Sequence, residues 1–217
     1  FKKRITVGDP ISQAKIYEAN FADELILLSI DNKVLEKNTK YIELISKLSE
    51  NIFMPLCAGG GVRTIKDFES LLLAGCDKVS VNTLLLNNLK IVQEASRKFG
   101  SQCIVASVDF SKLENDYFVY DHQNKTSSNI EVISFCKLLQ ESGIGEIHLC
   151  DINNDGASLG LDCKIANQLS EVLDIPLIIS GGVGKADDFI LGFNQGRADA
   201  IAAGTYFCLR DQNPMQS

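Results

Sequence analysis

The feature that most constrains the fold is an internal repeat with a spacing of 121 residues (176 − 55, for instance). Pro55-Leu56, Gly60-Gly61-Val62, Asp67-Phe68 and Gly75 recur as Pro176-Leu177, Gly181-Gly182-Val183, Asp188-Phe189 and Gly196. With a shift of one residue, Glu24 also matches Glu146, and Thr83 matches Thr205. The alternative is coincidence among residues that are common in α/β proteins. A constant spacing across a strand, a Gly-rich turn and a helix indicates two similar halves.

Short apolar segments alternate with amphipathic ones from end to end, as in α/β proteins with a parallel sheet. Eight segments are predicted to be strands: Arg4–Thr6, Glu24–Ile30, Met54–Ala58, Lys78–Val81, Ile104–Asp109, Glu146–Cys150, Pro176–Ile179 and Ala200–Ala203. Seven are predicted to be helices: Ile11–Asn20, Lys40–Ser49, Ile65–Ala74, Leu89–Phe99, Glu131–Ser142, Asp162–Leu173 and Asp187–Gln195. Several strands are apolar throughout, which favours parallel strands covered by helices.

Residues typical of helix ends support several of these boundaries. Thr64 is predicted to cap the helix that begins at Ile65, with Asp67 three residues further on. Gly75, Gly143 and Gly196 come directly after predicted helices, where a left-handed backbone conformation is needed.

Strands that alternate with helices close into a barrel or spread into a doubly wound sheet. Because a four-strand half that occurs twice gives eight units, the repeat favours a single (β/α)8 TIM barrel, with half-barrels at about residues 1–100 and 101–217. Thr6 runs directly into Val7-Gly8-Asp9-Pro10, so the first βα loop is expected to be shortened or missing. Either the barrel is trimmed at this point or the given sequence leaves out a segment. The segment after the eighth strand is too short for a full closing helix.

Composition narrows the class of protein. The chain has 217 residues, is 45% hydrophobic and carries a formal net charge of −7. This charge argues against nucleic-acid or membrane-surface partners, which select for basic patches. The seven cysteines include no C-x-x-C pair, so we expect reduced thiols in a cytoplasmic protein, with neither a metal site nor a cofactor.

Two Gly-rich segments carry the clearest binding signal. Cys57-Ala58-Gly59-Gly60-Gly61-Val62-Arg63 follows the third predicted strand, and Ser180-Gly181-Gly182-Val183-Gly184 follows the seventh. Glycine lets backbone N–H groups approach an anion closely, and the next helix start adds positive potential. Asn82-Thr83 and Gly204-Thr205 would complete two phosphate sites. The alternative is that each Gly-Gly pair only makes a tight turn.

Two carboxylates lie where barrel enzymes carry their catalytic groups, at the carboxyl ends of strands. Asp109 ends the fifth predicted strand and suits acid–base chemistry, and Asp155 follows the sixth. The alternatives are a loop-capping aspartate and a turn. Asp151 and Asp31 are weaker candidates at the same edge. His122 is expected in an exposed loop, Tyr120–Ser128, with a small hairpin, and His148 in the core.

Several motifs, taken in order, resemble the cyclase subunit of imidazole glycerol phosphate synthase (HisF) and its paralogues. They are Gly8-Asp9-Pro10, Ala22-Asp23-Glu24-Leu25, Gly59-Gly60-Gly61-Val62-Arg63, Asp77-Lys78-Val79-Ser80-Val81-Asn82-Thr83, Phe99-Gly100-Ser101-Gln102, Gly145-Glu146-Ile147, Asp155-Gly156 and Ser180-Gly181-Gly182-Val183-Gly184. The resemblance covers nearly the whole chain, and the Phe-Gly-Ser-Gln and Asp-Lys-Val-Ser stretches separate it from the related HisA-type isomerase.

The resemblance implies an ammonia-using synthase that works as a heterodimer with a HisH-like glutaminase. The glutaminase docks on the N-terminal face of the barrel, and ammonia crosses the barrel to a phosphorylated nucleotide. By the same resemblance, Asp109 is one of two catalytic aspartates. Phosphate or substrate contacts map onto Gly60, Gly61, Asn82, Thr83, Asp155, Gly181, Gly182, Gly204 and Thr205.

Three departures distinguish this chain from the histidine-pathway pattern. The first-strand segment that carries the other aspartate is absent, Leu-Asp-Ile reads Leu28-Ser29-Ile30, and Asp-Arg-Asp-Gly reads Asn153-Asn154-Asp155-Gly156. A related branch supplies ammonia for acetamidino groups on bacterial surface sugars, together with an N-acetyl sugar amidotransferase, and typically lacks that aspartate. The sequence therefore favours this branch, with the histidine-pathway cyclase and a non-catalytic ammonia conduit as alternatives.

Overall fold

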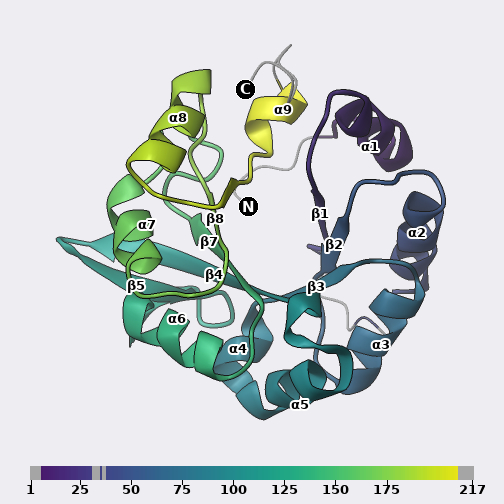
Figure 1. Ribbon diagram of the computed structural model, residues 1–217, viewed down its shortest axis with the longest axis horizontal. Coiled ribbons are helices and arrows are strands. Elements are labelled where there is room, and N and C mark those ends of the chain that lie inside the picture. The colour runs from purple at the N-terminus through teal and green to yellow at the C-terminus, as the bar shows by residue number, and fades with distance from the viewer. Residues whose placement is uncertain (1–5, 31–34, 36–37, 210–217) are drawn as a thin grey trace.

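The computed structural model describes residues 6–30, 35 and 38–209 of the chain. Seven parallel strands form one curved sheet in the order β1-β2-β3-β4-β7-β8-β9. Their bounds are β1 Leu25–Leu28, β2 Leu56–Gly59, β3 Lys78–Val81, β4 Ile104–Leu113, β7 Glu146–Asp151, β8 Leu177–Ser180 and β9 Ala200–Ile201. Figure 1 shows the strands curling around a centre, with the helices on the outside.

The helices follow the strands in alternation. Their bounds are α1 Pro10–Ala19, α2 Thr39–Ser49, α3 Ile65–Leu73, α4 Thr83–Asn87, α5 Leu89–Phe99, α6 Val132–Glu141, α7 Cys163–Ser170, α8 Ala186–Asn194 and α9 Thr205–Leu209. All seven predicted helices are present, with ends within three residues of those expected. The short helices α4 and α9 were not predicted, because five residues are too few to show a helical period. No helix in the described ranges is long and apolar enough to cross a membrane.

The prediction of an α/β fold with parallel strands that curl as in a (β/α)8 barrel is confirmed. Seven of the eight predicted strands are present; the other, Arg4–Thr6, lies outside the described residues except for Thr6, which is not in a strand. The described sheet has β1 and β9 at its two ends. Helices α1 and α9 flank this opening, and the Tyr17 hydroxyl lies 3.1 Å from the Cys208 thiol across it.

Strand β4 is longer than predicted because it continues into an antiparallel hairpin. Strand β5 (Asp116–Asp121) pairs with β4 and with β6 (Thr126–Glu131). The expected small hairpin in Tyr120–Ser128 is therefore the outer part of a three-stranded meander. Figure 1 shows β5 projecting beyond the ring of helices.

In each half of the chain, a buried aspartate accepts hydrogen bonds from backbone N–H groups at the start of a helix. The buried carboxylate of Asp67 accepts hydrogen bonds from the backbone N–H groups of Arg63 (2.9 Å) and Thr64 (2.8 Å) before α3. Asp188 does the same for Gly184 (2.8 Å) and Lys185 (3.0 Å) before α8. The predicted cap by Thr64 is also present, since its hydroxyl accepts from the N–H of Asp67.

One predicted helix end is wrong in detail. Gly75 and Gly143 adopt left-handed φ values of +102° and +88°, as expected. After α8, however, the left-handed residue is Arg197 (φ 53°) and not Gly196. A Cβ atom on Gly196 would lie 2.6 Å from the carbonyl oxygen of Gly192. Glycine is needed at position 196 for close packing rather than for its φ.

Removing either capping carboxylate should destabilise the fold. We expect Asp67→Ala and Asp188→Ala each to lower the free energy of unfolding by about 1–3 kcal/mol, because buried N–H groups lose their acceptor. Urea denaturation would measure the loss. The matched control is Asp187→Ala, since the Asp187 side chain is 72% exposed and its loss should cost less than about 0.5 kcal/mol. Equal losses at positions 187 and 188 would contradict the assignment.

Candidate active site

The predicted site residues gather at the carboxyl edge of the sheet, because parallel strands all end there. The centre of this group is Asp109 in β4, whose side chain is 16% exposed. Its Oδ2 atom accepts a hydrogen bond from Asn82 Nδ2 at 3.1 Å, and Asn82 also donates to the carbonyl of Ser107 at 2.9 Å. The structure thus brings Asp109 and Asn82 together. The amide of Asn82, predicted to hold phosphate, orients the carboxylate here.

A third group reaches the same carboxylate oxygen. His122, in the turn between β5 and β6, forms a hydrogen bond to Asp109 Oδ2 through Nε2. This hydrogen bond raises the pKa of His122, and partial burial lowers it by less. From the sequence, His122 is expected in an exposed loop, without a role in the site. The missed signal was the two-residue turn Glu114-Asn115, which sets the register between β4 and β5 and returns the chain over Asp109.

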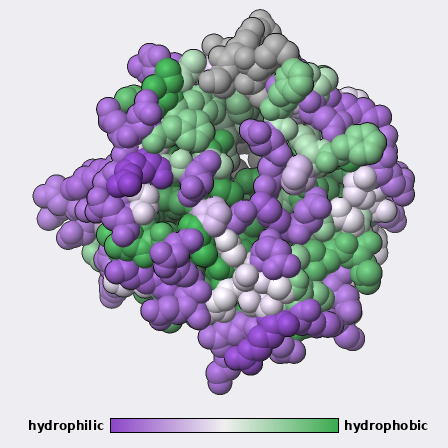
Figure 2. Space-filling view, viewed as in Figure 1, coloured by the Kyte–Doolittle hydropathy of each residue, from purple (hydrophilic) through white to green (hydrophobic). Residues whose placement is uncertain are grey.

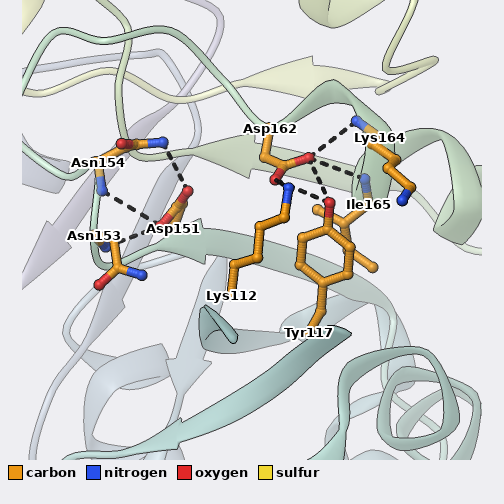
Figure 3. A network of polar contacts seen from close by, with 8 residues as sticks. All are labelled: Lys112, Tyr117, Asp151, Asn153, Asn154, Asp162, Lys164 and Ile165. Atoms are coloured by element: carbon orange, nitrogen blue, oxygen red, sulfur yellow. Dashed lines mark hydrogen bonds and ion pairs between the residues drawn. The ribbon is translucent and has the colours of Figure 1, made fainter. Parts of the chain in front are cut away.

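Two further aspartates differ in what they do. Asp155 is exposed, and partial desolvation together with the negative charge of Asp109 raises its pKa. Asp151 is buried and accepts from the N–H of Asn153 (2.9 Å) and from the side chain of Asn154 (2.9 Å). Figure 3 shows this turn. Asp151 therefore shapes the loop that presents Asp155. Asp31 lies outside the described residues.

The Gly-rich loops have left-handed backbones, with φ of +97° at Gly60, +77° at Gly61, +85° at Gly181 and +117° at Gly182. Neighbouring backbone explains why glycine is required at three of these positions. A Cβ atom would lie 2.1 Å from the Ser29 oxygen at position 60, 2.5 Å from the Asp151 oxygen at 181 and 2.1 Å from the Gly160 oxygen at 182.

The helix starts beyond these loops are already occupied by carboxylates. Asp67 and Asp188 hold the N–H groups at positions 63–64 and 184–185, as described above. A phosphate would therefore depend on the amides of the glycine segments themselves. Binding of phosphate at these loops stays a prediction.

The remaining predicted residues lie around the same edge. Thr83 begins α4 and Thr205 begins α9. A Cβ atom on Gly156 would lie 3.8 Å from Thr205 Oγ1, so the loops after β7 and β9 are neighbours. Gly204 is exposed, and no atom lies within 4 Å of its Cβ position among the described residues. Thr205 and the adjacent Gly204 therefore lie beside the loop that carries Asp155.

Polar side chains continue inward from this edge. Residues 78, 80 and 82 of the β3 segment alternate onto one face, as do residues 146, 148 and 150 of β7. Ser80, Ser107 and His148 are buried, and His148 Nε2 lies 2.8 Å from the Ser180 hydroxyl. Burial lowers the pKa of His148. The expectation of a core histidine is confirmed.

An ion-pair cluster lies at the opposite, N-terminal end of the strands. Lys78 Nζ is 2.7 Å from both Glu24 Oε2 and Glu146 Oε1. Burial raises the pKa of Glu24 against the opposing effect of Lys78. Burial also pulls the pKa of Lys78 down, but its hydrogen bonds to the two glutamates leave that pKa raised. The one-residue shift that matched Glu24 with Glu146 therefore corresponds to a real symmetric pair about Lys78.

A barrel-like parallel sheet with repeated Gly-rich loops at its carboxyl edge defines a protein of the α/β-barrel class. The family model described as "Histidine biosynthesis protein" matches residues 1–210, so the chain belongs to this family. It is similar to the HisF subunit of imidazole glycerol phosphate synthase from Hydrogenobaculum sp. (strain Y04AAS1), with 38% identity over 92% of this chain and 79% of that protein.

Two other similar proteins are also named as subunits of imidazole glycerol phosphate synthase. The HisF subunit of Exiguobacterium sp. (strain ATCC BAA-1283 / AT1b) is 37% identical over 91% of this chain and 77% of its own length. A protein of Prochlorococcus marinus (strain MIT 9313) that is named as subunit hisF2 of the same synthase is 39% identical over 100% of this chain and 82% of its own length. The resemblance to HisF deduced from the motifs is confirmed at the level of the family.

The ion-pair cluster yields a pH-dependent prediction. Lys78→Met leaves two glutamates close together without a cation, so we expect a loss of about 1–3 kcal/mol near pH 8. The loss should shrink at about pH 5, because protonated carboxyl groups no longer repel each other. Urea unfolding at both pH values would measure it. Lys98→Met is the control, because the Lys98–Glu69 pair is exposed; a pH-independent loss at Lys78 would contradict the prediction.

Proposed function

We propose that this chain is a HisF-type cyclase subunit that receives ammonia from a glutaminase partner and uses it at the carboxyl edge of the barrel. The observation that carries this proposal is the row of polar side chains between the Lys78 cluster at one end of the strands and Asp109 at the other. Branched apolar residues usually fill barrel interiors. Buried hydroxyl and imidazole groups along the same face, followed by the half-buried amide of Asn82, suit the passage of a small polar molecule.

The N-terminal edge offers a surface for the partner. Phe21 (74% exposed), Phe53 (98%) and Leu73 (82%) lie in the segments that lead into β1, β2 and β3, respectively. Large exposed apolar side chains that share one edge of a protein are typical of an interaction surface. Their position at the Lys78 end of the strands supports docking of the glutaminase where ammonia would enter.

The second part of the proposal concerns the pathway in which this subunit works. The missing first-strand aspartate, together with Ser29 and Asn153, favours the branch that modifies bacterial surface sugars with an N-acetyl sugar amidotransferase. The description of the matching family, "Histidine biosynthesis protein", favours histidine biosynthesis instead. Expression of the chain in a bacterium that lacks its own HisF would separate the two. Growth without histidine would overturn the sugar-pathway proposal.

The non-catalytic conduit is the remaining alternative. A barrel that only passes ammonia onward has no need to hold a carboxylate between an amide and an imidazole at its exit. The contacts of Asp109 with Asn82 and His122 therefore favour catalysis.

A direct assay tests the catalytic role. With ammonium salt and the ribulosyl formimino carboxamide nucleotide, we expect Asp109→Asn to lower kcat by roughly 10²–10⁴-fold, because general acid–base catalysis is lost. Asp116→Asn, an exposed position in the same hairpin, should leave kcat unchanged. Absence of turnover in the wild-type protein would favour the conduit, and unimpaired turnover in Asp109→Asn would contradict the catalytic role of Asp109.

Partner binding is tested separately. We expect Phe53→Asp to weaken binding of a HisH-type glutaminase at least ~10-fold, since a charge replaces an apolar contact in the interface. Calorimetric titration would measure the dissociation constant. Leu159→Asp is the matched control, because Leu159 is also exposed (76%) but lies at the carboxyl edge. Equal effects of the two substitutions would argue against docking on the N-terminal face.

A further inference from the structure

The β4–β5–β6 meander brings a histidine back over the catalytic carboxylate, and its base is firmly anchored. The Tyr117 hydroxyl donates to the carboxylate of Asp162 at 3.0 Å, and Lys112 Nζ lies 3.7 Å from the same group. Asp162 also accepts from the N–H groups of Lys164 (3.1 Å) and Ile165 (3.3 Å) at the start of α7. Figure 3 shows the side chains of Lys112 and Tyr117 pointing toward Asp162. The meander is therefore fastened to the main body of the protein.

The tip of the meander is fixed by its own hydrogen bonds. Asp121 accepts from the N–H of Gln123 (2.7 Å) and from the side chain of Asn124 (2.7 Å). The side chain of Asn87, in α4, donates to Gln123 Oε1 at 3.0 Å. These contacts tie the tip to the loop after β3, on the side of Asn82. His122 lies between the base of the meander, which is held at Asp162, and the tip, which is held at Asn87. Its ring packs edge-to-face with Tyr120, with 5.0 Å between the ring centroids.

We propose that His122 is a positioning residue that relays protons between Asp109 and solvent. The imidazole contacts Asp109 Oδ2 on one side and is 45% exposed on the other, so it joins a sheltered carboxylate to water. The inference rests on the proposed function, in which Asp109 exchanges a proton with substrate. It gives this chain an acid–base pair within one half of the barrel. The resemblance to HisF would place the second acid–base residue on the first strand, in a segment that this sequence lacks.

The proton balance is simple. When Asp109 takes a proton from substrate, the carboxyl group passes it to Nε2 of neutral His122, and the imidazolium loses its Nδ1 proton to water. Asp109 is then a carboxylate again, and exchange of the ring protons with water restores the Nδ1–H tautomer, whose free Nε2 accepts the next proton. In the reverse direction, His122 takes a proton from water and Asp109 delivers it. No oxidant or co-reactant is involved.

Other titratable groups near Asp109 do not fit this role. Burial lowers the pKa of His148, which is bonded to Ser180 away from solvent. Burial raises the pKa of the Cys150 thiol, so it stays protonated. Asp155 carries the same charge as Asp109 and repels it. Asp121, beside His122, lies at the exposed tip and stabilises the imidazolium from outside.

Two variants and two readouts test the proposal. His122→Gln keeps an amide donor near Nε2 but cannot relay a proton, whereas His122→Ala removes both properties. We expect kcat to fall about 10-fold or more in both variants, with KM nearly unchanged. The wild-type rate should rise with pH through the His122 pKa, and this limb should be absent from both variants. Added imidazole should restore turnover to His122→Ala.

The second readout does not need turnover. NMR titration of the His122 ring should give a pKa above about 6.5 in the wild type and a value closer to 6.5 in Asp109→Asn. A wild-type rate and pH profile in His122→Gln would overturn the relay and leave a purely structural hydrogen bond. An unchanged His122 titration in Asp109→Asn would overturn the pairing itself. Absence of turnover in the wild-type protein, with the NMR shift present, would instead overturn the proposed function.

Discussion

Parallel pairing of the strands in one continuous register is the constraint on which the rest of the structure depends. Because β4 and β7 pair with Ser107 opposite His148 and Asp109 opposite Cys150, side chains of one parity all face the same side of the sheet. A slip of one residue would move Asp109 to the helix-covered side and bring apolar side chains into its place. The register thus fixes the positions of the carboxylate and the buried polar row behind it. Figure 2 shows hydrophilic residues over most of the rim and apolar residues deeper toward the middle.

The internal repeat preserves the framework more faithfully than the chemistry. Asp67 and Asp188 cap equivalent helices through equivalent N–H groups, and Glu24 and Glu146 meet at one lysine. The aspartate pair satisfies backbone N–H groups before each helix, and the glutamate pair neutralises the half-buried Lys78 between the two halves. The carboxyl edge is not symmetric in this way. The second half extends β4 into a meander, whereas the sequence of the first half passes from Thr6 to Gly8 with almost no loop.

Sequence reasoning succeeded where local patterns decide the outcome. The spacing of apolar residues located the helices, and the repeat revealed the two related halves. It failed where a contact depends on a chain reversal. His122 lies in a polar stretch, and only the β4–β5 register shows that it returns to Asp109. The glycines show the same limit, because a Gly-Gly pair looks the same whether it makes room for an anion or for the Ser29 and Gly160 carbonyls.

The meander also determines which contacts an acid–base pair at Asp109 depends on. An acid–base pair on opposite halves of a barrel depends on both halves keeping their distance and orientation. A pair formed by β4 and its own hairpin depends on one strand register, a tyrosine–aspartate anchor and an aspartate turn. The proton relay proposed for His122 therefore depends on contacts within β4 and its own hairpin, and Asn82 holds the same carboxylate oxygen from the segment after β3.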